Sequence, residues 1–256
     1  MKRAMLFAKR NITETLRDPL SYIFCLGFPI VMMIIMTIVD RAIPPEANMT
    51  VFRIDNLTGS MIVFGQCFIM LFTTLNVSKD RQSSFLIRMF ATPMTAGDFA
   101  FGYLLSMVGT AFLQSLITLT AGFILSAFTG FSLNPATMIA AVFLALPSAV
   151  FFTAIGLLFG SLFNDKSAPG LCSVIISLAS FLGGFWMDVE QLGGTILKIC
   201  RFFPFLFCTR SVRCTIAGDF SFETFGKSMI SVCITCALVC LFAVLAFRAK
   251  MKADLK

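Results

Sequence analysis

The chain alternates between long apolar runs and short polar segments, and this alternation restricts its fold more than any motif does. The runs cover residues of about 20–39, 58–77, 99–127, 136–162, 168–187 and 224–247. A helix needs roughly 20 mostly apolar residues to cross roughly 30 Å of hydrocarbon, where every backbone group must be hydrogen-bonded internally. Each run therefore predicts one transmembrane helix. We expect an all-α integral membrane protein in which residues 1–256 form a single transmembrane domain of six spans.

The composition agrees with a membrane location. Hydrophobic residues make up 58% of the chain and charged residues 13%, whereas soluble domains average about 45–50% and about 25%. Three of the nine cysteines, Cys233, Cys236 and Cys240, share one helix face. The chain has no histidine to assist metal binding, so we expect these thiols to pack as small hydrophobes and predict no metal site.

The charge distribution predicts the orientation. Six spans put both ends of the chain on one side, which carries thirteen basic and six acidic residues, the whole net charge of +7; the other side carries seven of each. Lys and Arg are enriched in cytoplasmic loops, so both termini are predicted to be cytoplasmic, and the basic excess requires no nucleic acid. The basic residues on that side are Lys2, Arg3, Lys9, Arg10, Arg17, Lys79, Arg81, Arg88, Lys166, Arg248, Lys250, Lys252 and Lys256.

A seventh span at about 192–212 is the main alternative to this topology. The stretch is apolar but contains Lys198, Arg201 and Arg210, and burying three cations in hydrocarbon costs several kcal/mol. We therefore predict short helices that dip into the outer leaflet within the outer segment 188–223. Whether this segment gates an exit, and whether two of its cysteines form a disulfide, stay open; these cysteines are Cys200, Cys208 and Cys214.

The first nineteen residues predict an amphipathic helix on the inner leaflet. Three arginines recur every seven residues and form one stripe, whereas four apolar side chains share another face and Phe7 breaks that pattern; the two sets are Arg3, Arg10, Arg17 and Met5, Ala8, Ile12, Leu16. Simple anchoring by positive charge is the alternative. Pro19 ends the helix and turns the chain toward the membrane.

Residues 78–98 break the apolar pattern with a short, half-charged segment. Its apolar residues recur at the spacing of one helix face, Pro93 stops that helix, and the sequence from Thr95 to Asp98 predicts a capping box for the next span. A solvated loop resting on lipid is one interpretation, and an element that docks into a soluble partner is the other. The apolar face consists of Phe85, Leu86, Met89 and Phe90.

The order of these features resembles the membrane subunit of an ABC transporter, of the six-span exporter permease type. The stretch "LRDPLSYIFCLGFPIVMMI" is similar to the start of that family's first span, and "DRQSSFLIRMFATPMTAGDFAFGYLL" to its cytosolic loop, with Thr92-Pro93 matching. Asp80 stands where Glu is usual and Ser84 where Gly is usual. The outer segment is similar at Phe203-Pro204, Arg213 and Gly218.

This resemblance implies a separate cytosolic ATPase subunit and a second permease copy or paralogue, in a bacterial cell membrane. The chain itself is expected to bind no cofactor, with ATP and Mg²⁺ on the ATPase. The near P-loop "SFETFGKS" at 221–228 lacks its first glycine and follows no predicted strand. The residues that the resemblance assigns to ATPase coupling are Asp80, Arg81, Phe85, Arg88, Met89, Pro93, Arg17 and Asp18.

The apolar spans suit an amphipathic or lipid-like cargo, and the resemblance implies a drug, an antimicrobial peptide or a lipid-like molecule. No charged residue lies deep in a predicted span, whereas ion-coupled carriers usually place one there. An ion-coupled carrier or channel is therefore the second hypothesis, and a membrane-embedded lipid enzyme the third. The candidate pathway residues are Gln66, Thr73, Gln114, Phe181 and Phe185, although interhelical hydrogen bonding is the commoner role for the two glutamines.

Overall fold

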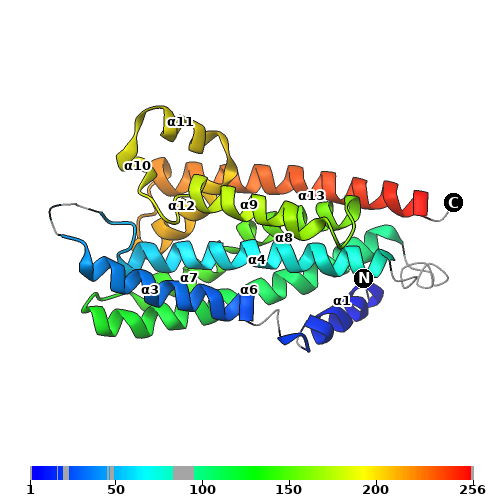
Figure 1. Cartoon of the computed structure of the whole chain (residues 1–256), viewed down its shortest axis with the longest axis horizontal. Helices are drawn as coiled ribbons and strands as arrows, with labels where there is room; N and C mark the ends of the chain where they lie inside the picture. The colour runs from blue at the N-terminus through cyan, green and yellow to red at the C-terminus, as the bar shows by residue number, and fades with distance from the viewer. Residues whose placement is uncertain are drawn as a thin grey trace.

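The computed structural model is a bundle of long helices that run roughly parallel to one axis (Figure 1). It describes residues 2–15, 17–19, 23–44, 46, 49–82 and 95–254. Within these ranges every regular element is a helix and none is a strand. The predicted all-α class is therefore confirmed for the described part of the chain.

The helices follow one another as a bundle of long helices, with shorter helices inserted near the predicted outer end. In chain order the elements are α1 (Lys2–Thr15), η1 (Ile23–Gly27), α3 (Phe28–Ala42), α4 (Ile54–Gln82), α6 (Ala96–Thr129), α7 (Pro135–Leu144), α8 (Leu146–Leu162), α9 (Ala168–Leu182), α10 (Val189–Leu192), α11 (Gly194–Phe202), α12 (Pro204–Ala217), η3 (Phe222–Gly226) and α13 (Lys227–Asp254).

Five helical stretches of the described chain are long and apolar enough to cross a membrane. They are Ile23–Ala42, Ile54–Gln82, Ala96–Thr129, Pro135–Leu162 and Phe222–Met251, and they correspond to the first four predicted spans and the sixth. The remaining predicted span, at 168–187, is the apolar helix α9, which ends at Leu182 and has only 15 residues. Five long candidates and one short apolar helix thus stand where six spans were predicted.

Local sequence signals set several helix ends. Thr95 and Asp98 form the predicted reciprocal capping box at the start of α6. The predicted fourth span is interrupted at Ala145 between α7 and α8, because Pro147 lacks the N–H that would continue the helix. Pro29 likewise stands in the first turn of α3, directly after the π-helical η1.

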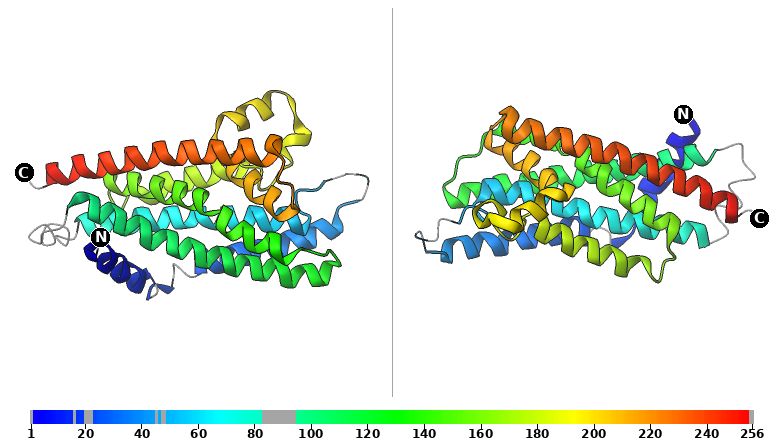
Figure 2. Two further views of the ribbon diagram at one scale, coloured as in Figure 1. Left: turned by 180° about the vertical axis from the view of Figure 1, so that it is seen from behind. Right: turned by 90° about the horizontal axis from the view of Figure 1, so that it is seen from above.

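Both described ends of the chain lie at one end of the bundle. α1 and the last turns of α13 are found there in all the views, together with the end of α4 and the turn between α8 and α9 (Figures 1 and 2). The connection between α3 and α4 and the segment α10–α12 lie at the opposite end. The two described chain ends thus lie on the same side of the bundle, which is the arrangement that six spans predict.

α4 is the central helix of the bundle. Within its most apolar stretch 78% of the residues are buried, against 17% for the stretch that contains α13. α4 packs against α3, α6, α8, α9 and α12. α13 instead lies along one side of the bundle and exposes large apolar side chains, among them Ile234, Leu238 and Phe242, which suits contact with hydrocarbon.

Two glycines of α8 allow its close contact with α4. A Cβ atom at Gly156 would lie 2.5 Å from the carbonyl oxygen of Met70, and one at Gly160 would lie 2.8 Å from that of Thr74. The two positions are four residues apart, the small-xxx-small spacing at which membrane helices approach backbone to backbone. The hydroxyl of Thr74 also donates to the Gly156 carbonyl at 3.1 Å, so the α4–α8 pair is fixed by both packing and a hydrogen bond.

Candidate functional site

The end of α4 joins three other helices at the predicted cytosolic end of the bundle. Asp80 Oδ2 accepts a hydrogen bond of 2.6 Å from the hydroxyl of Tyr103 on α6. Asp80 Oδ1 lies 3.9 Å from the guanidinium of Arg10 on α1. The carboxylate is mostly buried, so these contacts compensate its loss of water. Asp80 therefore connects α4 to both α1 and α6.

Arg81 connects the same end of α4 to α8. Its Nη1 donates to the carbonyl of Gly160 at 3.1 Å and also to the carbonyl of Ser161. The last carbonyls of a helix have no partner within that helix, and a cation there also interacts favourably with the helix dipole. Arg81 is therefore held against the end of α8. A displacement of α4 would be transmitted to α8 through this contact.

α1 docks onto α6 through Phe7, the residue that breaks its predicted apolar face. The Phe7 ring lies edge-on to Phe99 at 5.2 Å and to Tyr103 at 4.9 Å. Gly102 makes room for this ring, because a Cβ atom there would lie 2.6 Å from Cδ1 of Phe7. Met5, by contrast, is 59% exposed. α1 thus packs on the protein with one face and presents another to its surroundings.

Four predicted coupling residues, Phe85, Arg88, Met89 and Pro93, lie outside the described residues. Their role therefore stays a prediction, as does the predicted short helix. Arg17 and Asp18 are described and form the turn after α1, where the Arg17 N–H donates to the carbonyl of Glu14 at 3.1 Å. The structure brings Asp80 and Arg81 to one junction and places the α1 turn on the same side of the bundle.

The polar pathway candidates are buried in helix contacts. Gln66 donates to the carbonyl of Ala145 at 3.2 Å and accepts from the hydroxyl of Ser148 at 2.7 Å. It therefore holds α4 against the α7–α8 break, the interhelical role weighed as its alternative. Thr73 donates to the carbonyl of Ile69 within α4 at 2.7 Å. Neither side chain is accessible in the single chain.

The remaining pathway candidates do not converge either. Gln114 is fully buried against Gly65, and its amide donates to Thr118 of the same helix at 2.9 Å. Phe185 is fully buried with its ring 5.8 Å from that of Phe64, whereas Phe181 is 55% exposed. Within one chain the five candidates are thus distributed over packed helix contacts and an outer surface, and they do not line a common cavity.

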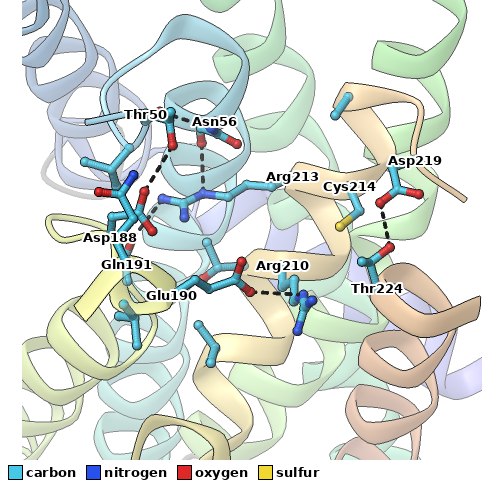
Figure 3. A pocket seen from close by; sticks show the side chains of 16 residues that line it. Thr50, Asn56, Asp188, Glu190, Gln191, Arg210, Arg213, Cys214, Asp219 and Thr224 are labelled. Carbon is cyan, nitrogen blue, oxygen red and sulfur yellow. Dashed lines mark hydrogen bonds and ion pairs between the residues drawn. The ribbon is translucent and has the colours of Figure 1, made fainter. Parts of the chain in front are cut away.

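A polar pocket of about 500 Å³ lies instead at the predicted outer end of the bundle, and it was not predicted from the sequence. It lies between the start of α4, the α9–α10 connection, α12 and the start of η3 (Figure 3). The side chains drawn in Figure 3 include Thr50, Asn56, Asp188, Glu190, Gln191, Arg210, Arg213, Cys214, Asp219 and Thr224. We call this cavity the outer pocket.

Arg213 of α12 forms the wall of the outer pocket next to α4. Its Nε donates to Ser60 Oγ at 2.9 Å, and its Nη2 donates to Ser60 Oγ at 2.6 Å and to the Gly184 carbonyl at 2.8 Å. Nε also lies 3.2 Å from the Asn56 carbonyl. α12 approaches so closely because Gly59 has no side chain: a Cβ atom there would lie 3.0 Å from Cγ of Arg213.

Burial lowers the pKa of Arg213 to about 10, although Asp188 and Glu190 partly offset this effect. The guanidinium therefore stays charged at neutral pH. Its four hydrogen-bond contacts are to neutral oxygens, so no carboxylate neutralises it directly.

Further polar contacts hold the rest of the outer pocket. Arg210 Nε lies 3.3 Å from a carboxylate oxygen of Glu190, and Thr50 donates to Asp188 at 3.0 Å. Asp219 accepts from the hydroxyl of Thr224 at 2.6 Å and from a backbone N–H. These hydrogen bonds lower the pKa of Asp219, so this carboxylate is charged at neutral pH.

The outer segment contains short helices, as predicted. Phe203 separates α11 from α12, so the stretch 192–212 is not one continuous helix. All nine cysteines are free thiols: Cys200 and Cys208 are buried, and Cys214 lines the outer pocket. The described residues contain no group of three potential His, Cys, Asp or Glu ligands for a metal ion.

The sequence contains a partial signal for the α4–α8 contact and for the Arg213 site, neither of which was predicted. The glycine pair at 156 and 160 has the spacing of a membrane helix contact. Arg213 was noted only for its resemblance to a family position. A cation in a mostly apolar outer segment requires a buried acceptor, but the sequence does not indicate that Ser60, more than 150 positions earlier, supplies it.

The described geometry provides fixed helix contacts at one end of α4 and a charged pocket at the other. No curated protein matches the chain. The family model of the ABC-2 type transporter matches residues 3–216, which is most of the chain. This match includes α1, the α4 junction and most of the outer segment. The chain therefore belongs to the ABC-2 type transporter family, as a membrane permease component of an ABC transporter.

Proposed function

We propose that this permease is the membrane subunit of an ATP-driven exporter that moves an amphipathic cargo. A separate cytosolic ATPase subunit hydrolyses ATP with its Mg²⁺, and a second permease copy or a paralogue completes the pathway. α9 is the fifth of six spans, and both termini are on the cytoplasmic side of a bacterial cell membrane. Membership of the ABC-2 family supports the transport role and the dependence on an ATPase.

One observation carries the mechanism: α4 connects the two ends of the bundle. Its 29 residues span about 44 Å at 1.5 Å per residue. Asp80 and Arg81 at one end bind α6 and α8. At the other end Asn56 and Ser60 bind Arg213 of α12. A force applied to residues 83–94, which follow α4 directly, would therefore reach the outer pocket through one rigid helix.

The apolar surfaces of the spans support the proposal of an amphipathic cargo. The candidate spans contain buried hydroxyl and amide groups but little charge at depth. Phe, Met, Leu and Ile dominate both the core and the exposed faces. Such a surface favours molecules with a large apolar part. A drug, an antimicrobial peptide or a lipid-like molecule has this character.

A pull-down of the tagged chain from its native membranes in mild detergent tests the proposal. We expect a soluble ATPase to co-elute in stoichiometric amount and to show vanadate-sensitive ATP hydrolysis. The double variant Phe85→Ala/Arg88→Ala should lose most of the co-eluting ATPase, because a hot-spot residue contributes roughly 2 kcal/mol or more to an interface.

The matched control is Arg201→Ala/Phe202→Ala, which removes the same two side-chain types at the outer end, where Phe202 is 84% exposed. This control should retain the ATPase. Elution without any ATPase, from membranes in which transport collapses with an ionophore but survives ATP depletion, would contradict the proposal and indicate ion-coupled transport.

A further inference from the structure

The outer pocket contains two guanidinium groups one helical turn apart. Arg210 and Arg213 both project from α12 into it (Figure 3). The contacts of Arg213 use Nε and Nη2, and its Nη1 has no partner among the described residues. Because neighbouring oxygens fix this guanidinium in place, it loses little entropy when it binds another group. A fixed guanidinium with an unused N–H edge is suited to an oxyanion.

Carboxylates lie around the same pocket, so a simple anion is not the best ligand. Asp188, Glu190 and Asp219 all line it. Glu190 is paired with Arg210, whereas Asp188 uses only Oδ2, in its bond to Thr50. Asp219 bonds only to neutral hydroxyl and N–H groups. The pocket thus offers sites for a cation beside sites for an anion, and a zwitterion satisfies both.

The residues that line the outer pocket also favour a primary ammonium over a quaternary one. None of the described residues that line the outer pocket is aromatic. A quaternary ammonium is typically bound by aromatic rings, whereas a primary ammonium donates hydrogen bonds to carboxylates and hydroxyls. Asp188, Asp219 and Thr224 provide such acceptors. The pocket is therefore suited to a primary ammonium.

Large exposed apolar side chains stand next in sequence to several residues of the outer pocket. Leu192 follows the pocket residue Gln191 and is 54% exposed, while Phe220 and Phe222 follow Asp219 and are 52% and 66% exposed. Large exposed apolar side chains next in sequence to residues of a polar pocket suit an amphipathic ligand. A soluble zwitterion would leave them in water.

We propose that the outer pocket binds the headgroup of a phospholipid that carries a phosphate and a primary ammonium, a phosphatidylethanolamine. The phosphate lies against Arg213 and Arg210, and the ammonium against Asp188 and Asp219. The acyl chains extend past Leu192 and Phe222 into the membrane. This proposal goes beyond the transport function, since it concerns binding to the permease alone and requires neither ATP nor an ATPase.

Cys214 provides a reporter for occupancy because its thiol lines the pocket. The full chain is placed in lipid nanodiscs, and the rate of maleimide labelling is measured; Cys214→Ser supplies the background from other thiols. Burial raises the pKa of the Cys214 thiol, so the reaction is run in mildly alkaline buffer to form thiolate. Discs containing phosphatidylethanolamine are compared with discs containing phosphatidylcholine, at constant phosphatidylglycerol.

We expect Cys214 to react about tenfold more slowly in the phosphatidylethanolamine discs, a ratio that corresponds to roughly 1.4 kcal/mol of binding preference. Arg210→Gln and Asp219→Asn should each remove most of this difference. The matched control Lys198→Gln removes an exposed cation of α11 that does not line the pocket and should preserve it. For each variant we compare the ratio of its labelling rates in the two lipids. A direct effect of the substitution on thiol reactivity changes both rates equally and cancels in this ratio.

Equal labelling rates in the two lipids would overturn the proposal. The proposal would also be overturned if Lys198→Gln removed the difference in labelling rate between the two lipids as Arg210→Gln does. The net charge of the protein, and not the pocket, would then explain the effect. Free phosphoethanolamine, added to phosphatidylcholine discs at the same concentration as the lipid headgroup, should protect poorly. Equal protection by this soluble compound would overturn the assignment to a lipid.

Discussion

Replacing Gly156 with leucine is expected to destabilise the bundle by about 3 kcal/mol or more, since overpacking a core typically costs about 1–3 kcal/mol and here the clash is with backbone. The new Cβ atom would lie 2.5 Å from the Met70 carbonyl oxygen and 2.7 Å from Cβ of Thr73. Backbone on α4 cannot move away as a flexible side chain can. α8 must therefore separate from α4, and the bond from Thr74 to the Gly156 carbonyl would be lost with it.

Thermal unfolding in detergent, followed by tryptophan fluorescence or aggregation, provides the measurement. We expect Tm to fall by roughly 6 °C or more, given about 2–4 °C per kcal/mol for a chain of this size. The matched control is Gly109→Leu on α6, where a Cβ atom meets nothing within 4 Å. Similar Tm values for the two variants would show that the α4–α8 contact is not limited by these glycines.

The second large effect is expected for Arg213→Gln. The shorter amide cannot reach Ser60 and the Gly184 carbonyl together, and these buried oxygens lose their donors. Hydrogen bonds to a charged group contribute about 1.5–3 kcal/mol each, so we expect a loss of about 3 kcal/mol or more in stability. α12 should also separate from α4, because the guanidinium connects them across Gly59.

Arg210→Gln is the matched control, since it makes the same substitution one turn earlier on the same helix. Arg210 lies beside a partly exposed Glu190, and such pairs contribute about 0–1 kcal/mol. Tm in detergent and limited proteolysis of the outer segment should separate the two variants. An Arg213→Gln chain that melts with Arg210→Gln and resists protease like the unsubstituted chain would show that Arg213 does not hold α12.

Signals that depend on local sequence predicted much of the fold. Apolar run length located the long helices, and the pair Thr95 and Asp98 predicted the cap of α6. These features follow from the chemistry of a few neighbouring residues. The break at Phe203 directly precedes Pro204, and the three cations of the stretch 192–212 oppose a continuous span.

Features that depend on distant partners were not predictable in the same way. Phe7 became the docking residue of α1 because Gly102 leaves a space for its ring. Gln66 was predicted as a pathway residue, with interhelical hydrogen bonding as the alternative, and only the structure identifies Ala145 and Ser148 as its partners. The outer pocket combines residues from four separate segments, and no single segment carries its pattern.

The short length of α9 also has a consequence for the surrounding lipid. A helix of 15 residues is about 22 Å long, while unperturbed hydrocarbon is roughly 30 Å thick. If α9 spans the membrane, the leaflets beside it compress, and each ångström of mismatch costs a fraction of a kcal/mol. Headgroups then sit deeper on this flank than elsewhere around the protein. The elastic cost falls in a thinner bilayer. The length of the lipid acyl chains therefore changes the free energy of the permease in its membrane.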